Sequence, residues 1–219
     1  MRFVLTTLIF QFALLSSNLS QTTIKFLALG DSYTIGESLP SEQNWPNQLA
    51  NRLETENKAD EVETTIIAKT GWRTDDLINA MNQATLLDSY DLVSLSIGVN
   101  NQYQHKELDQ YIEEFETLLK KAVELSGNRP KRVFVLSIPD YYYTPFGKLK
   151  GDKTISAELK LYNRIARSHC EKYGVSFLNI TPISKKGIED FTLVARDELH
   201  PSAKQYKLWV DLILETKFK

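Results

Sequence analysis

The stretch LALGDSYT, residues 27–34, holds the transition on which the expected fold depends. It continues the apolar positions Ile24 and Phe26, and this apolar run ends in glycine, aspartate and serine. A short run of apolar and branched residues is typical of a buried strand, whereas Gly30, with backbone angles that a Cβ resists, is expected to turn the chain. We therefore expect Ser32 just beyond the carboxyl end of the first strand, where ligands bind in open α/β sheets. Taken alone, the tripeptide fits an ordinary polar turn as well.

Apolar runs and helical patterns alternate along the rest of the chain. Further strands are expected at 62–68, 91–97, 133–138 and 175–180, and helices at 45–56, 74–87, 108–126, 155–173 and 203–217. Thr74 is the expected N-cap of the second helix, and the segments 140–154 and 181–199 are expected to be irregular. Because strands that alternate with helices form right-handed βαβ units, the sequence predicts an α/β fold with a five-stranded parallel sheet covered on both faces.

Composition excludes several classes of partner. The 219 residues suffice for one sizeable domain. With 26 basic and 28 acidic residues and no basic block, nucleic acid is not an expected partner. Cys170 is the single cysteine, so no internal disulfide can form, and its helical setting favours a buried small residue. No metal-binding cluster of His and Cys and no glycine-rich nucleotide loop is present, so no metal or cofactor is expected.

Residues 1–20 differ from the remainder of the chain. Arg2 precedes an apolar run at 3–15, and small and polar residues follow at 16–20. This layout is typical of a secretory signal peptide, and the run is too short for a stable membrane span of about 20 residues. An N-terminal strand or helix of the fold is the alternative. We expect an exported protein, periplasmic or extracellular, whose single domain covers 21–219.

Candidate catalytic residues follow the expected strands and precede the last helix. Acyl transfer needs a nucleophile, a base, a group that orients the base, and donors for the oxyanion. Ser32 offers the hydroxyl, His200 the base, and Asp197 an acceptor for the other ring nitrogen. The backbone N–H groups of Ser32 and Gly71 and the side-chain amide of Asn100 are the expected oxyanion donors. A side chain at position 71 would obstruct the approach of the carbonyl oxygen.

Four sequence blocks in this order carry a family resemblance. GDSYT at 30–34, Gly71, GVNN at 98–101 and DELHP at 197–201 resemble the motifs of the SGNH, or GDSL-type, hydrolases, which include esterases, lipases and thioesterases. The resemblance covers the whole chain after residue 20. It implies a flavodoxin-like three-layer α/β/α sandwich, and it assigns Ser32, His200 and Asp197 to catalysis and Gly71 and Asn100 to the oxyanion hole. Asn101 stands where the family commonly has an acid, so no charge is expected beside the oxyanion amide.

Aromatic residues near these blocks are candidates for substrate binding. They are Trp72, Tyr141, Tyr142, Tyr143 and Phe146. Packing at a helix start is the alternative role of Trp72, and a cover over the core is the alternative for the others. The expected substrate is a small acyl ester or an acetylated sugar, and lysophospholipids and thioesters also fit. The chain length of the acyl group and the oligomeric state are not readable from the residues.

Two other classes of function remain open at this point. One is a catalytically silent module that binds carbohydrate or a surface on the same fold. The other is a phosphate or flavin binder, which Asp31 disfavours because a carboxylate at the phosphate position of such a loop would repel an anion.

Overall fold

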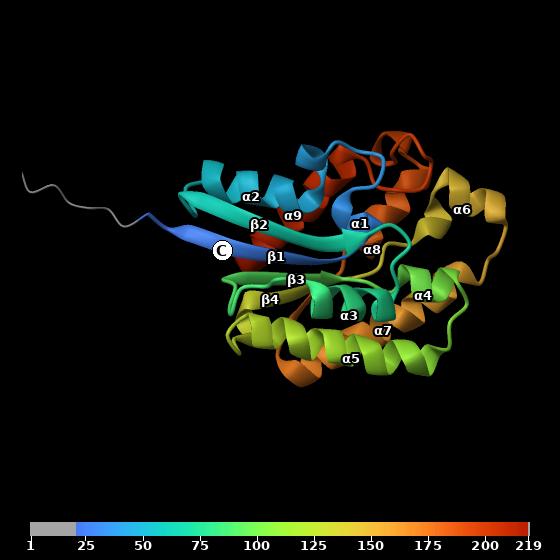
Figure 1. The fold of residues 1–219 in the computed structure, drawn as a ribbon. Coiled ribbons are helices and arrows are strands. Elements are labelled where there is room, and N and C mark those ends of the chain that lie inside the picture. Colours follow the sequence, from blue (N-terminus) through green and yellow to red (C-terminus); the bar gives the residue numbers. More distant parts are fainter. Residues whose placement is uncertain (1–20, 219) are drawn as a thin grey trace, which may run out of the picture.

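The computed structural model describes residues 21–218, in which a five-stranded sheet lies between two layers of helices (Figure 1). The strands are β1 (Thr23–Asp31), β2 (Glu61–Lys69), β3 (Leu92–Ser96), β4 (Val133–Leu136) and β5 (Ser176–Leu178). All four pairings are parallel, and the order across the sheet is β2-β1-β3-β4-β5. This is the flavodoxin-like order, so the predicted fold class is confirmed. The predicted signal peptide, residues 1–20, lies outside the described residues.

Strand β1 is the point at which the direction of winding changes. Gly30 pairs with Ala68 of β2 on one side and with Ser96 of β3 on the other. The chain therefore runs from β1 outward to β2 and returns past β1 to β3. Such a switch opens a crevice at the carboxyl ends of the two strands, and Ser32 follows β1 at this crevice.

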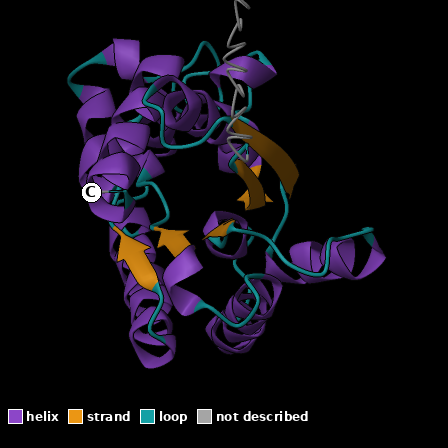
Figure 2. Ribbon diagram, turned by 90° about the vertical axis from the view of Figure 1, so that its left-hand side faces the viewer, coloured by secondary structure: helices purple, strands orange, loops and turns teal. Residues whose placement is uncertain are grey.

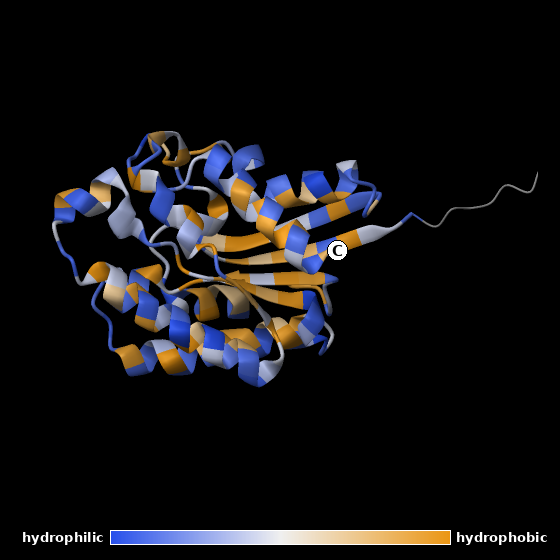
Figure 3. Ribbon diagram, turned by 180° about the vertical axis from the view of Figure 1, so that it is seen from behind, coloured by the Kyte–Doolittle hydropathy of each residue, from blue (hydrophilic) through white to orange (hydrophobic). Residues whose placement is uncertain are grey.

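Helices cover both faces of the sheet. Figure 1 shows α2 (Trp45–Thr55) and α9 (Ala203–Lys217) on one face, and α3 (Thr74–Gln83), α5 (Leu108–Leu125) and α7 (Ile155–Tyr173) on the other. Figure 2 shows helices on both sides of the strands in a view turned by 90°. Apolar residues turn inward and hydrophilic ones outward in both layers (Figure 3). Large aromatic side chains fill the interior, since the ring of Phe26 lies 6.1 Å from that of Trp45 and 6.5 Å from that of Phe134. Burial of this apolar area is the main favourable term in folding.

The structure corrects several local expectations. Helix α3 begins at Thr74 with Arg73 in the N-cap position, and it ends at Gln83 rather than near residue 87. The segments expected to be irregular contain short helices instead. These are η3 (Tyr141–Tyr143), α6 (Pro145–Lys150), α8 (Thr181–Ser184), η4 (Lys185–Ile188) and η5 (Phe191–Leu193). The other short helices are α1 (Ser32–Ile35), η1 (Ser41–Gln43), α4 (Val99–Tyr103) and η2 (Pro130–Arg132).

The sequence contains residues that start and stop helix α6. They were overlooked because this segment shows no periodic pattern of apolar residues. The hydroxyl of Thr144 accepts the N–H of Gly147 at 3.1 Å, as an N-cap does, and Pro145 occupies the first helical position. Gly151 ends the helix with a φ of +66°. A helix of six residues cannot show an amphipathic repeat, so only its caps identify it.

Two further expectations concern membrane-spanning helices and the single cysteine. Within residues 21–218, none of the helices combines the length and apolarity that crossing a bilayer requires. Cys170 lies buried on α7, as predicted, and burial raises the pKa of its thiol to about 12. A buried thiol with a raised pKa forms little thiolate and is unreactive.

Candidate active site

Close packing of the chain at the end of β1 positions Ser32. A Cβ on Gly30 would lie 2.1 Å from Oγ1 of Thr34 and 2.6 Å from the carbonyl oxygen of Ser96. We expected Gly30 to adopt backbone angles that other residues avoid, but it has no positive φ. A glycine is needed here because a Cβ would clash with neighbouring atoms. Asp31 then caps the four-residue helix α1 by accepting the N–H of Tyr33 at 3.0 Å. Ser32 is therefore the first residue of a helix at the carboxyl edge of the sheet.

Ser32, His200 and Asp197 form a continuous chain of hydrogen bonds. Nε2 of His200 lies 2.9 Å from Oγ of Ser32, and Nδ1 lies 2.7 Å from Oδ2 of Asp197. With Nδ1 donating to the carboxylate, Nε2 is left to accept the proton of the hydroxyl. The His200 side chain is buried, and its ring packs against that of Tyr33 at 5.2 Å between centroids. The three side chains have the mutual geometry of a serine nucleophile, a base and an orienting acid.

Four hydrogen bonds hold Asp197 in its ionised form. Its Oδ1 accepts the backbone N–H groups of Leu199 at 3.0 Å and His200 at 2.9 Å, and its Oδ2 accepts the Ser38 hydroxyl at 2.6 Å in addition to Nδ1 of His200. Burial alone would raise the pKa of Asp197, but the bonds from Ser38, from the backbone and from His200 outweigh it and lower the pKa to about 2. Asp197 is therefore a carboxylate at neutral pH. The contact with Ser38 was not expected from the sequence, and no pattern there signals it.

Gly71 and Asn100 lie beside Ser32 at the same pocket. Gly71 has a φ of +81°, and a Cβ there would meet no heavy atom within 4 Å, so the glycine leaves open space. The side-chain Nδ2 of Asn100 donates to the backbone carbonyl of Trp72 at 2.9 Å, which leaves its second proton available. Gln104 donates to the carbonyl of Gly71 at 3.1 Å. These two hydrogen bonds connect the turn after β2 to Asn100 in α4 and to Gln104 directly after α4.

Asn101 has a structural role. Its Oδ1 accepts the N–H of Thr74 at 3.1 Å, and its Nδ2 donates to the hydroxyl of Thr74 at 2.7 Å. The Asn101 side chain is fully buried. A neutral amide both donates and accepts here, which a carboxylate could not do, so the departure from the family motif places no charge beside Asn100.

The pocket beside Ser32 has a volume of about 170 Å³ and an aromatic wall. Tyr141 and Phe146 line it, as two of the five predicted aromatic residues. Tyr103 also lines it and lies 6.0 Å from Tyr141 and 6.5 Å from Phe146 between ring centroids. Tyr103 follows Asn100 by three residues on the same short helix, and this spacing could have identified it. The remaining lining residues are Tyr33, Thr70, Val99 and Leu199.

The other three predicted aromatic residues lie outside this lining. Lys148 lies over the rings of Tyr142 and Tyr143, at 3.7 and 5.0 Å from their centroids. Trp72 contributes a backbone carbonyl to the site, as the acceptor for Asn100, and its side chain packs against the core. The structure therefore divides the predicted set, with Tyr141 and Phe146 at the pocket and Trp72, Tyr142 and Tyr143 away from its wall.

Asp31 supports the site without reaching the pocket lining. Burial raises the pKa of its carboxyl to about 7, although hydrogen bonds from backbone N–H groups oppose this shift. The residue is 2 % exposed, so ionisation carries a desolvation cost. Across residues 21–218, no three side chains of His, Cys, Asp or Glu are grouped so as to hold a metal ion.

Known proteins resemble this chain in sequence or in fold. The chain is 22% identical over 203 residues to a spore germination lipase, LipC, of Bacillus licheniformis, with 84% of the chain and 92% of the relative covered. An acetyl xylan esterase of Geobacillus stearothermophilus superposes with a TM-score of 0.68 at 17% identity and covers 88% of this chain and 93% of its own. A lipase/acylhydrolase of Enterococcus faecalis gives a TM-score of 0.67 at 20% identity, with 88% and 94% covered. At these identities, the structural likeness establishes the fold.

The fold and the site together define the class, a hydrolase of ester bonds on a parallel α/β sheet. Residues 28–208 match the GDSL-like lipase/acylhydrolase family. The chain belongs to this family, and the resemblance inferred from its sequence blocks is confirmed.

Proposed function

We propose that the protein is an exported serine esterase that acts through an acyl-enzyme on Ser32. The observation that carries the proposal is the hydrogen-bonded chain from Ser32 through His200 to Asp197, with distances of 2.9 and 2.7 Å. Ester hydrolysis itself is the activity of the family to which the chain belongs. The assignment of each step to a residue is the part that we infer from geometry.

In the first half of the reaction, Oγ of Ser32 attacks the carbonyl carbon of the ester while Nε2 of His200 takes the hydroxyl proton. The tetrahedral intermediate then collapses, and His200 returns this proton to the leaving alcohol. Asp197, ionised because its pKa is lowered to about 2, accepts the N–H of the imidazolium that forms. In the second half, His200 deprotonates a water molecule that attacks the acyl carbon, and the acid leaves as Ser32 regains its proton.

The negative charge on the carbonyl oxygen needs donors that are in place before the reaction. We assign this role to the backbone N–H groups of Ser32 and Gly71 and to the free proton on Nδ2 of Asn100. All three residues line the same pocket. The carbonyl of Trp72, which accepts the other Nδ2 proton at 2.9 Å, holds the amide of Asn100 in one orientation.

The size of the pocket favours short acyl groups. Its volume of about 170 Å³ is below the range of roughly 300–1,000 Å³ that drug-sized ligands occupy. Tyr103, Tyr141 and Phe146 enclose the space beside Ser32. We therefore propose acetyl and similarly short esters as substrates. The solved relative described as an acetyl xylan esterase supports acetylated sugars as one source of such esters.

Export is part of the proposal and rests on residues 1–20 alone. Their charged start, apolar run and small residues are typical of a signal peptide that is removed. N-terminal sequencing of the protein from its native cells should begin near Gln21. Retention of residues 1–20 would contradict export with cleavage.

Covalent labelling tests the proposed function directly. A fluorophosphonate probe should modify wild-type protein at Ser32, and Ser32→Ala should abolish both labelling and the hydrolysis of p-nitrophenyl acetate. Ser41→Ala is the matched control, because Ser41 lies in the 3-10 helix η1 and does not line the pocket. A Ser32→Ala protein with wild-type turnover would falsify the assignment. A folded wild-type protein that neither labels nor turns over would favour a silent binding module.

A further inference from the structure

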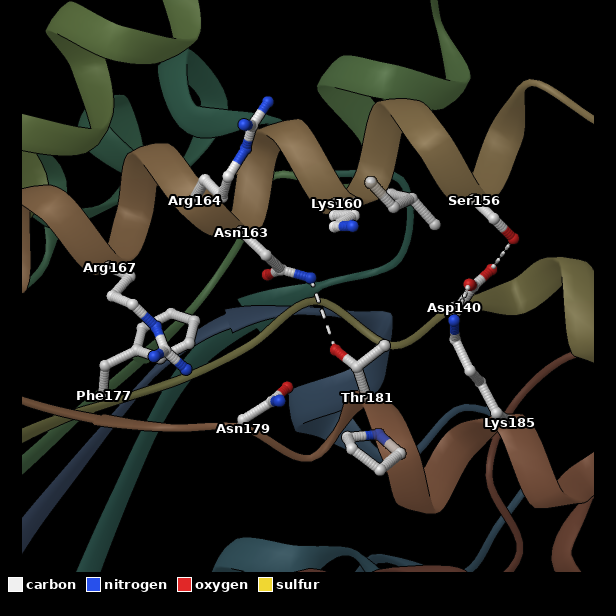
Figure 4. Close-up of a pocket in the computed structure, with 12 residues that line it drawn as sticks. Asp140, Ser156, Lys160, Asn163, Arg164, Arg167, Phe177, Asn179, Thr181 and Lys185 are labelled. Atoms are coloured by element: carbon white, nitrogen blue, oxygen red, sulfur yellow. Dashed lines mark hydrogen bonds and ion pairs between the residues drawn. The ribbon is translucent and has the colours of Figure 1, made fainter.

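A second and larger hollow opens beside helix α7, with a volume of about 470 Å³ (Figure 4). We call it the α7–β5 groove, and its walls include Lys160, Asn163, Arg167, Phe177, Asn179 and Lys185. None of these residues lines the catalytic pocket. We propose that this groove binds an extended anionic carbohydrate, a chain of sugars that carry carboxylates.

Unpartnered cations along one helix face carry the first step of the argument. Lys160 and Arg167 both line the groove from α7 and lie seven residues apart, so about 10 Å of helix separates them. Within residues 21–218, neither side chain makes a hydrogen bond or an ion pair. Two exposed cations set about two helical turns apart favour a ligand with more than one anionic group over a single small ion.

Arg167 is held in a position suited to a carboxylate. Its guanidinium carbon lies 5.1 Å from the centroid of the Phe177 ring, and Figure 4 shows the two side chains side by side at one end of the groove. A guanidinium stacked on a ring keeps its N–H groups free in its own plane, where they can bind a carboxylate in bidentate fashion. Arg164 also lines the groove, but its guanidinium points away from Thr181 in Figure 4, and we assign it no contact.

The opposite end of the groove carries a compensated charge. Lys185 lies 3.3 Å from the carboxylate of Asp140, which also accepts the Ser156 hydroxyl at 3.0 Å. Asp140 is 2 % exposed, so it is a paired group inside the wall and leaves the charge of the opening to Lys160 and Arg167. A ligand would therefore place its carboxylates toward α7.

Uncharged polar groups between the cations favour a sugar chain. Asn179 is exposed, and its Nδ2 donates no hydrogen bond within the described residues, since only its Oδ1 is used, by Ser137 at 3.2 Å. A free amide beside cations suits a ligand that bears hydroxyls as well as carboxylates. A flat lipid surface would not reach the floor of a concave groove.

The groove lies close to the catalytic pocket in the chain. Asp140 lines the groove, and the next residue, Tyr141, lines the catalytic pocket. Both follow β4 at the carboxyl edge of the sheet. The groove and the pocket beside Ser32 therefore adjoin the same loop after β4.

Calorimetric titration of the wild-type protein with unesterified oligogalacturonate tests the proposal. This probe contains no acyl ester, so its binding does not depend on the proposed hydrolysis. We expect saturable binding that weakens as salt rises, and at least tenfold weaker binding by Lys160→Ala/Arg167→Ala. Lys25→Ala/Lys131→Ala removes the same charge from exposed positions in β1 and in η2, outside the groove, and should bind as the wild type does.

Each contrary outcome has a defined meaning. Absence of binding by the wild type, or an equal loss in both double variants, would overturn the site. Equal affinity for neutral xylo-oligosaccharides would show that charge does not select the ligand and would overturn the proposed anionic ligand. Equal affinity for poly-glutamate would assign the groove to acidic peptides and overturn the proposed carbohydrate. Thermal unfolding checks that the variants are folded, and Arg167→Gln, which removes the charge but keeps a polar side chain, repeats the test should the double variant unfold.

Discussion

The hydroxyl of Ser38 lies 2.6 Å from Oδ2 of Asp197, the same oxygen that accepts Nδ1 of His200. Ser38 has a φ of +68°, in the left-handed region where a residue with a Cβ is strained. The strained backbone therefore presents a hydroxyl to the carboxylate that orients the proposed base. A hydrogen bond to a charged group contributes roughly 1.5–3 kcal/mol, which makes Ser38 a positioning residue for the proposed reaction.

Ser38→Gly should separate this role from folding. The variant loses the hydroxyl, so we expect kcat to fall by about ten- to a hundredfold with KM unchanged. Relief of the backbone strain should offset much of the stability lost with the bond, so the melting temperature should change little. Kinetics on p-nitrophenyl acetate and thermal unfolding measure both effects.

The matched control for this experiment is Asn57→Gly. Asn57 also has a positive φ, of +54°, and it lies in an exposed turn after α2. It should keep the wild-type kcat, and its gain from backbone relief should be smaller, because asparagine tolerates the left-handed region better than serine. An unchanged kcat in Ser38→Gly would show that the hydroxyl does not position the carboxylate.

Asn100→Ala should lower kcat by roughly a hundredfold or more, as removal of an oxyanion donor does. Loss of the bond to the carbonyl of Trp72 should cost only about 1 kcal/mol of stability. Gln104→Ala serves as the control, because it removes a similar bond to the carbonyl of Gly71, and the bond from Arg73, without removing a group from the pocket lining. A large loss of stability with intact turnover in Asn100→Ala would make Asn100 structural.

The acyl preference should depend on Phe146. The wild-type protein should hydrolyse acetyl and butyryl esters far better than palmitoyl esters, because the pocket beside Ser32 is about 170 Å³. Phe146→Ala removes part of the wall and should shift the ratio of kcat/KM toward longer chains. Phe191→Ala, at an exposed phenylalanine outside this pocket, should leave the ratio unchanged. A wild-type preference for palmitoyl esters would contradict the proposed substrate class.

Asp31→Asn should change the pH dependence of stability. The pKa of Asp31 is raised by burial from 3.8 to about 7, so the folded state binds more protons than the unfolded state between these values. Stability therefore falls as pH rises from about 4 to 7. The variant, which can still cap α1, should equal the wild type near pH 4 and exceed it at pH 8 by about 1–4 kcal/mol.

Denaturant titrations across this pH range measure the effect of Asp31→Asn. Asp190→Asn provides a contrast of opposite sign, because hydrogen bonds from Lys204 and Thr192 lower the pKa of Asp190 to about 2. Its contribution is present at neutral pH and is lost on acidification. A wild-type stability that rises between pH 4 and 7 relative to Asp31→Asn would contradict the burial argument.

Local patterns determined a large part of this protein. Runs of apolar residues identified the five strands. These runs alternate with segments of helical periodicity, and both patterns can be read from the sequence without knowledge of the tertiary contacts. The pairing of Asp197 with His200 is also local, because the turn between them places Oδ1 of Asp197 on the N–H groups of Leu199 and His200. The spacing of these residues was therefore enough to suggest an acid and a base.

Tertiary structure decided the rest. Ser32 and His200 come from opposite ends of the chain, and their 2.9 Å contact exists because the sheet and α9 bring the two segments together. Ser38 and the Trp72 carbonyl likewise depend on contacts between distant segments. Such contacts leave no periodic pattern, because each joins single residues whose separation along the chain is arbitrary.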